Sequence, residues 1–210
     1  METAQTFTEE ELKTMGMRTL DLLVSSIENN EPKKAKQLAQ RMYNEFLGMH
    51  DLYRDWLTDL FSFVGRRSGD EVLEKAMAAT IAGLTRRLSQ FYKGKDARQR
   101  LQILSAGLRG HLQPFEVKED DEKYTITGSC CGSGGRLITD GKYEAPDNFL
   151  RIETPQEMTF NRPDFPVYCA HCYFQNISLA EPGGEPLFIT EPGERPGTDP
   201  CLIHIYKDRS

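Results

Sequence analysis

Residues 113–128, QPFEVKEDDEKYTITG, decide how this chain divides, because within them the spacing of hydrophobic residues changes from helical to extended. Hydrophobic and polar residues alternate in 115–118 and again in 124–127, with the polar stretch 119–123 between them. Two alternating runs around a short polar turn are typical of a β-hairpin. The stretch therefore predicts that an antiparallel sheet begins here.

The composition also changes at residue 112. All five cysteines lie after it, and of the eleven prolines only Pro32 precedes it. A shift of this kind marks a boundary between domains or layers. We therefore predict an α+β protein, with a helical domain at 1–112 and a small antiparallel, β-rich, metal-binding domain at 113–210.

Hydrophobic residues before the boundary recur at helical spacing, which predicts about five helices packed as a bundle. Capping-box patterns begin two of them, at Thr8 with Glu11 and at Ser68 with Glu71. Pro32 suits the first turn of a helix, where its missing N–H costs nothing. The expected helical segments are 8–29, 32–48, 51–64, 68–94 and 97–108.

Glycines mark several of these ends, since Gly48 and Gly65 interrupt the helical pattern. The segment 51–64 is expected to bury its hydrophobic stripe, which consists of Leu52, Trp56, Leu60 and Phe63.

Short extended runs follow the hairpin at 175–179, 187–190 and 201–206. In the last run Cys201, Ile203 and Ile205 share one face, so the Cys201 side chain is expected to point inward.

Charge and hydropathy favour some classes of protein over others. The net charge is −6, which argues against nucleic acid as the main partner. No run approaches the roughly 20 apolar residues of a membrane span. The polar, acidic N-terminus resembles neither a signal peptide nor a transit peptide, so a cytoplasmic protein is expected. The expected partners are a small-molecule substrate and a second copy of the chain, bound through the helical half.

The cysteines carry the strongest functional signal. They occur as Cys130-Cys131 before a glycine-rich stretch, as Cys169-Ala-His-Cys172, and as Cys201. In a reducing compartment such a group favours metal ligation over disulfides. Thiolates favour zinc, with an iron–sulfur cluster as the alternative. The best ligand set is Cys131, Cys169, Cys172 and Cys201; adjacent residues rarely bind one tetrahedral ion, so Cys130 is the alternative to Cys131.

The glycines after Cys131 predict a knuckle around the ion. Gly132, Gly134 and Gly135 permit positive φ and would let backbone N–H groups point at a thiolate or a substrate oxygen. A flexible hairpin loop is the alternative.

The number of protein ligands decides between two functions. Three leave a position for an activated water, whereas four make a structural site. We favour a zinc-dependent hydrolase or lyase acting on a small polar molecule. His171 and His111 are the candidate proton carriers, and Arg136 is the candidate carboxylate clamp. The alternatives are a non-catalytic interaction module stapled by zinc and an iron–sulfur or redox protein.

Two families share parts of this pattern. The segment 130–135 followed by Cys169-x-x-Cys172 resembles the CCG domains of heterodisulfide-reductase-type proteins, which implies an iron–sulfur cluster. The helical first half, the hairpin, the cysteine at 169 and the final Gly197-x-Asp199-x-Cys201 resemble small bacterial proteins of the 2-amino-thiazoline-4-carboxylate hydrolase type. That resemblance implies a small α/β ligand-binding domain, a hydrolase of small cyclic C–N substrates, and cysteines at the site.

Overall fold

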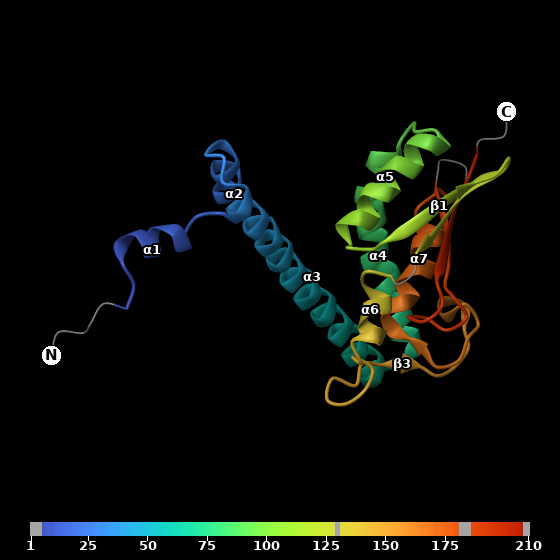
Figure 1. Cartoon of the computed structure of the whole chain (residues 1–210). Helices are drawn as coiled ribbons and strands as arrows, with labels where there is room; N and C mark the ends of the chain where they lie inside the picture. The colour runs from blue at the N-terminus through green and yellow to red at the C-terminus, as the bar shows by residue number, and fades with distance from the viewer. Residues whose placement is uncertain (1–5, 129–130, 181–185, 208–210) are drawn as a thin grey trace. The chain divides into compact units, whose positions relative to one another are not determined.

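The computed structural model describes residues 6–128, 131–180 and 186–207. Helices dominate the first 112 residues, and antiparallel strands occur only after them in the described part of the chain (Figure 1). The protein is therefore α+β, as the change of spacing at residue 113 predicts.

The chain forms two compact units, Met1–Leu52 and Tyr53–Ser210. The division falls inside the longest helix, α3 (Pro32–Ser68), whereas the composition changes at residue 112. Helices α4 (Asp70–Tyr92) and α5 (Ala97–Gly110) consequently share a unit with the sheet. In that unit α4 packs against α5 and α7 (His171–Ser178), and α5 packs against strand β6 (Cys201–Tyr206).

The N-terminal unit contains α1 (Glu9–Met15), α2 (Thr19–Glu28) and the start of α3. The predicted capping box is confirmed, since Thr8 accepts a hydrogen bond from the Glu11 amide and Glu11 accepts one from the Thr8 amide. The single helix expected over 8–29 is wrong, because α1 ends at Gly16 and Arg18 is extended. Thr19 donates a 2.7 Å hydrogen bond to Glu45 and so ties α2 to α3.

Helix α3 begins at Pro32 as predicted, but its expected ends at Gly48 and Gly65 are wrong. Open space surrounds the missing side chain of Gly48, and one glycine inside a helix costs only about 1 kcal/mol. Gly65 is a packing residue instead. A Cβ there would lie 2.4 Å from Leu150 Cδ2, so the glycine lets the loop before strand β3 (Arg151–Ile152) approach the helix.

The expected burial of Leu52, Trp56, Leu60 and Phe63 is also wrong, since all four are exposed. In the C-terminal unit α3 instead buries a face that includes Arg54, Thr58, Phe61 and Ser62. The Thr58 and Ser62 hydroxyls donate to carbonyls one turn earlier, and Arg54 forms ion pairs with Asp55 and Asp140. Satisfied polar groups allow this face to be buried although its sequence looks solvent-facing.

The helix caps differ from the expected ones. The Ser68–Glu71 box is wrong, because Gly69 is the N-cap of α4 and no side chain caps the helix there. Helix α5 has a capping box that was not expected, between Asp96 and Gln99.

The main sheet has the strand order β1-β2-β6-β5, with all pairs antiparallel. Its strands are β1 (Phe115–Glu119), β2 (Lys123–Gly128), β5 (Ile189–Glu191) and β6 (Cys201–Tyr206). The predicted hairpin and final strand are confirmed. The register of β2 and β6 pairs Gly128 with Cys201, so β2 ends opposite the first residue of β6.

The strand expected at 175–179 is wrong, because residues 175–178 belong to a helix and Leu179 is its C-cap residue. The short helix η2 (Val167–Ala170) leads directly into this helix, α7 (His171–Ser178). The remaining elements are α6 (Gly134–Thr139), η1 (Glu157–Thr159), and a second sheet of β3 (Arg151–Ile152) with β4 (Phe165–Pro166).

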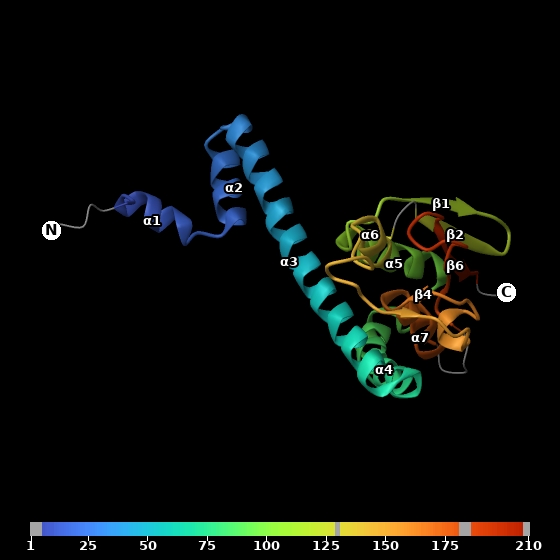
Figure 2. The same ribbon diagram turned by 90° about the horizontal axis from the view of Figure 1, so that it is seen from below.

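Two hydrophobic cores stabilise the C-terminal unit. The first joins α3, α4, α6 and α7 around Leu73, Met77 and Phe165. The second joins α5 to the sheet around Leu104, Ile126 and Ile205. Figure 2 shows α5 beside the sheet and α7 beside α4.

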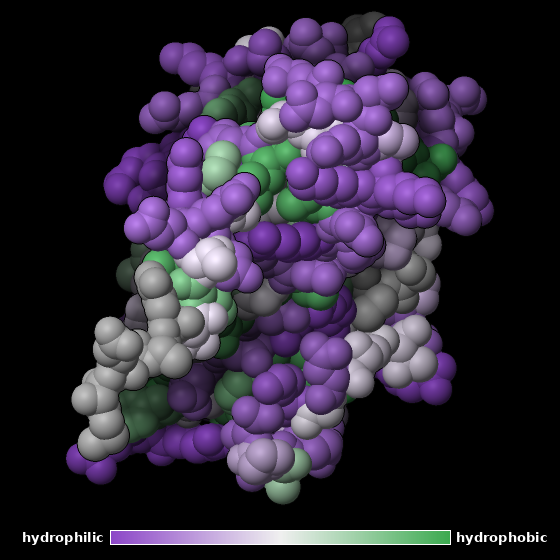
Figure 3. Space-filling view, turned by 60° about the vertical axis from the view of Figure 1, so that its left-hand side comes forward, coloured by the Kyte–Doolittle hydropathy of each residue, from purple (hydrophilic) through white to green (hydrophobic). Residues whose placement is uncertain are grey.

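The surface is mostly polar on the face drawn in Figure 3, where hydrophobic side chains form smaller patches between hydrophilic ones. None of the helices in the described residues has the length and apolarity that crossing a lipid bilayer requires.

Replacing Leu73 by alanine should destabilise the C-terminal unit by about 2–5 kcal/mol, because this side chain is fully buried in the first core. The matched control is Val72→Ala on the same helix, whose exposed side chain should change the free energy of unfolding by no more than about 0.5 kcal/mol. Urea denaturation of the full chain measures both. Equal effects of the two substitutions would contradict the assigned face of α4.

Candidate functional site

The glycine-rich loop after Cys131 is held by close backbone contact. A Cβ on Gly132 would lie 1.7 Å from the His111 carbonyl oxygen, and one on Gly134 would lie 2.9 Å from the Cys169 sulfur. Neither glycine has the positive φ that the sequence suggested, so that reason for them is wrong. They are required because the loop presses against the end of α5 and against Cys169.

The end of α5 meets this loop through a histidine. His111 is the C-cap residue of α5, and its Nδ1 lies 3.0 Å from the Ser133 hydroxyl. Ser133 is itself buried and precedes the first residue of α6. This contact joins the helical and β-rich segments at the Cys131 loop.

The Cys169–Cys172 segment bridges η2 and α7. His171 Nδ1 lies 2.5 Å from the Tyr168 carbonyl oxygen, which accepts a hydrogen bond from it, and His171 Nε2 lies 3.6 Å from the Cys172 sulfur. A carbonyl can only accept a hydrogen bond, so Nδ1 is the donor in this pair, and Nε2 is the nitrogen that faces Cys172. The Tyr168 ring packs edge-on against the imidazole, with centroids 4.8 Å apart, and fixes its orientation.

Cys201 comes from the other side, as the first residue of β6. The turn before it is tight, since a Cβ on Gly193 would lie 2.5 Å from the Asp199 carbonyl oxygen. An ion pair of 2.9 Å between Arg195 and Asp199 closes the same turn. These contacts hold Cys201 opposite Gly128 and close to the Cys131 loop.

The thiols influence each other electrostatically. Burial raises the pKa of Cys169 well above its usual value, and the neighbouring Cys172, Cys131 and Cys201 raise it further. Burial also raises the pKa of the Cys172 thiol to about 12. Burial raises the pKa of the Cys201 thiol to about 11, with a further contribution from the nearby Cys172 and Cys131. The Cys169, Cys172 and Cys201 thiols are therefore neutral near pH 7 unless a cation compensates their charge.

One cavity of about 370 Å³ brings most of these groups together. Its walls are apolar and come from both cores. Examples are Ile81, Leu84, Leu104, Leu179 and Phe188. Its polar lining includes Cys131, Cys172, Cys201, His171 and His111.

Two predicted residues lie outside this lining. Cys169 does not line the cavity but lies against Gly134, and Arg136 lies on α6 near the Gly132 carbonyl. As placed, no three Cys, His, Asp or Glu side chains of the described residues form a group that could hold a metal ion. The donor types suit zinc, but their spacing does not yet form a coordination shell. Cys130 lies outside the described residues.

Several lining residues were not expected from the sequence. Gln113, Gln175 and Thr190 also face the cavity. Gln175 lies three residues after Cys172 on α7, so a helical interpretation of 171–178 would have placed both on one face. Gln113 and Thr190 have no such local signal, because only the tertiary fold brings them to the cavity.

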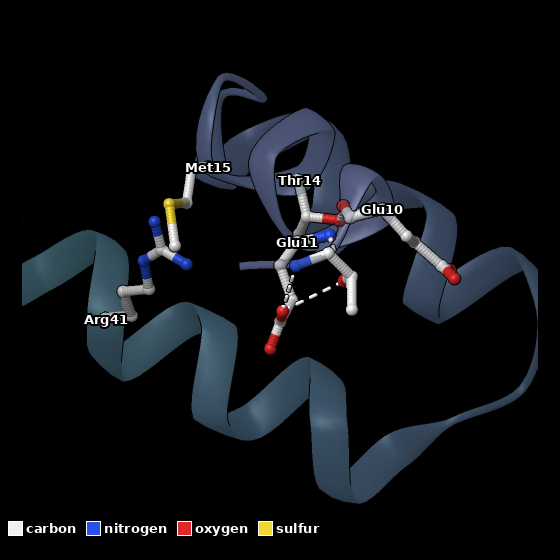
Figure 4. Close-up of a pocket in the computed structure, with 6 residues that line it drawn as sticks. Glu10, Glu11, Thr14, Met15 and Arg41 are labelled. Carbon is white, nitrogen blue, oxygen red and sulfur yellow. Dashed lines mark hydrogen bonds between the residues drawn. The ribbon is translucent and has the colours of Figure 1, made fainter. Parts of the chain in front are cut away.

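A second hollow, in the N-terminal unit, lacks comparable chemistry. It is lined by Thr8, Glu10, Glu11, Thr14, Met15 and Arg41 (Figure 4). All six are exposed, and the hydrogen bonds drawn there belong to the capping box of α1. We therefore place the functional site in the C-terminal unit.

No family model matches the chain, and no curated protein and no solved structure shows significant similarity to it. The two family resemblances noted from the sequence stay predictions.

Gly132→Ala should destabilise the protein by about 1–3 kcal/mol, because the added methyl group must push the loop away from the His111 carbonyl. Gly83→Ala is the control. Its Cβ would meet open space on α4, so this change should be neutral or stabilising by up to about 1 kcal/mol. Thermal and urea unfolding measure both, and a Gly132→Ala protein as stable as wild type would contradict the close approach.

Proposed function

We propose that the C-terminal unit binds a small molecule with an apolar body in this cavity and meets its polar end with a cysteine-held zinc ion. The observation that carries the proposal is the lining of the cavity. Its walls are apolar, while three cysteines and His171, from separate segments of the chain, share it. Ligand pockets typically combine apolar walls with a few convergent polar groups.

The apolar wall bears on the choice of ligand. A small polar molecule was expected from the sequence, but side chains such as Leu84, Leu104 and Phe188 favour a hydrocarbon or aromatic body. The polar part of the lining, which includes Cys131, Cys172 and Cys201, offers partners for a polar group. A ligand with one polar and one apolar end fits both parts of the lining.

What supports zinc is the convergence of soft donors. Cys131, Cys172 and Cys201 line the cavity, whereas Cys169 lies outside its lining. If only the three cysteines of the cavity held the zinc ion, its fourth coordination position would stay open toward the bound small molecule. If Cys169 also bound the ion, it would close that position. Because the thiols as placed do not form a coordination shell, zinc binding would require the cysteine side chains to move closer together.

His171 suits a role in proton transfer. Its Nε2 lies near the Cys172 sulfur, so the neutral imidazole could accept the thiol proton when a cation binds, or a proton from a ligand in the cavity. A zinc ion with an open position would supply an activated water or polarise a carbonyl. A hydrolase or lyase is therefore the reaction class that we propose.

The metal is tested by elemental analysis of the untagged protein, purified without added metal, with X-ray absorption at the edge found. We expect about one zinc per chain, and we expect Cys172→Ser and Cys201→Ser each to lose it. Ser178→Ala, on α7 outside the cavity lining, is a control that should retain the metal.

The same measurements separate the alternatives. Loss of zinc in Cys169→Ser, together with four sulfur ligands, would indicate a closed structural site. Iron with inorganic sulfide would indicate a cluster, and the absence of any metal would contradict the zinc proposal.

The cavity is tested with octanohydroxamate, which joins a zinc-binding head group to an apolar tail. Calorimetry should show binding to the zinc-loaded full chain. Leu84→Trp should weaken it about tenfold or more, because the larger ring occupies the partly exposed cavity wall. Val72→Trp, on the same helix but outside the cavity lining, should leave it unchanged. Equal affinity in both variants would contradict this binding site.

A further inference from the structure

Helix α3 has an exposed seam of hydrophobic residues with the spacing of a coiled coil. Within the C-terminal unit the seam contains Tyr53, Trp56, Leu60 and Phe63, at alternating steps of three and four residues. The same alternation continues upstream on the same helix. The whole seam is Met42, Phe46, Met49, Tyr53, Trp56, Leu60 and Phe63.

Every seam residue is exposed, although each is large and apolar or aromatic. Their exposed fractions are 38%, 47%, 51%, 59%, 70%, 50% and 65%, in chain order. Scattered exposed hydrophobic residues are normal, but a continuous stripe of this kind marks an interaction surface. A strict 3.5-residue repeat is the spacing that another helix of the same repeat can pack against.

We propose that this seam pairs with the same seam of a second copy, which makes the protein a homodimer joined through α3. The repeat itself identifies the occupant. Among the helices that the structure describes, no other one continues an exposed apolar repeat beyond a single heptad. A partner with the matching repeat is therefore provided by the chain itself, across a two-fold axis.

The area of the seam is sufficient for a dimer. Aromatic side chains cover roughly 150–250 Å² each, so the exposed parts of the seven seam residues sum to on the order of 800 Å². A stable interface buries about 800 Å² on each partner. Leu52 and Tyr43, beside the seam, are also exposed and would widen the contact. No seam position has a charged side chain that pairing would desolvate.

The charges along α3 favour a protein over a membrane surface. Between Met42 and Phe63 the helix has four acidic residues, and its only Arg or Lys is Arg54, which is buried in ion pairs. Helices that lie on anionic membranes have many lysines and arginines on the polar face. The acidic residues of α3 would be repelled by such a surface.

The chain provides its own reporter, since Trp56 is its only tryptophan and the most exposed seam residue. We expect the full chain to sediment as a dimer. Dilution below the dissociation constant should give a monomer whose Trp56 emission shifts to the red and becomes more easily quenched by acrylamide. Mass and fluorescence should change over the same concentration range.

Leu60→Glu keeps the reporter and places a charge in the seam, so it should raise the dissociation constant about thirtyfold or more. Tyr53→Glu is a second variant, and circular dichroism checks that both remain folded. Asn44→Glu adds the same charge to an exposed position of α3 outside the seam and should leave the dimer unchanged.

Three outcomes would overturn the proposal. One is a monomer at all concentrations, whether Trp56 is solvent-exposed or is shielded by another part of its own chain. Another is a dimer in which Trp56 stays exposed, because the contact then lies elsewhere. The third is a dimer that Leu60→Glu and Tyr53→Glu leave intact while folded.

Discussion

The pairing of β2 with β6 is the constraint on which the rest of the C-terminal unit depends. It joins the hairpin to the last strand of the chain and sets Gly128 opposite Cys201. The register is well determined, because Ile126, Ile203 and Ile205 are buried in the second core and a slip by one residue would turn them to the opposite face. Once this register is set, Cys201 lies opposite the end of β2, three residues before Cys131.

The cysteine cluster follows from that pairing and from the packing of the glycine loop. Gly132 lets the loop touch the end of α5, and Gly134 lets it touch Cys169. The α4–α7 contact then holds Cys172 and His171 at the cavity. Thiols gathered in this way stay protonated unless a cation compensates their charge, and zinc is the cation that we propose.

Helix α3 shows how one helix serves different environments. In the C-terminal unit its buried face includes Thr58 and Ser62, whose hydroxyls are satisfied within the helix, while its large apolar side chains are exposed. The hydrophobic effect alone would favour the opposite arrangement, in which the large apolar side chains are buried and the hydroxyl side chains are exposed. A second copy of the seam would remove this discrepancy, because pairing would bury the exposed aromatic residues without disturbing the polar face.

The sequence by itself determined the local features of the protein. Alternation of residues in 115–118, 124–127 and 201–206 predicted strands that the structure contains, and Thr8 with Glu11 predicted a helix start. The cysteines stood out because of their chemistry and clustering. Each of these signals depends on residues close together in the chain, whose hydrogen bonds and side-chain directions follow from local geometry.

Only the tertiary structure decided which faces are buried and which groups meet. Gly48 and Gly65 looked like helix ends, but α3 passes through both, and Gly65 is needed where Leu150 packs. The seam of α3 looked like a core stripe, because a helical repeat of apolar residues has the same spacing whether it faces a core or a partner chain. The cavity joins Gln113, Cys131, Cys172 and Cys201 from distant segments, and no local pattern specifies such contacts. They arise from packing between elements, which depends on the whole chain.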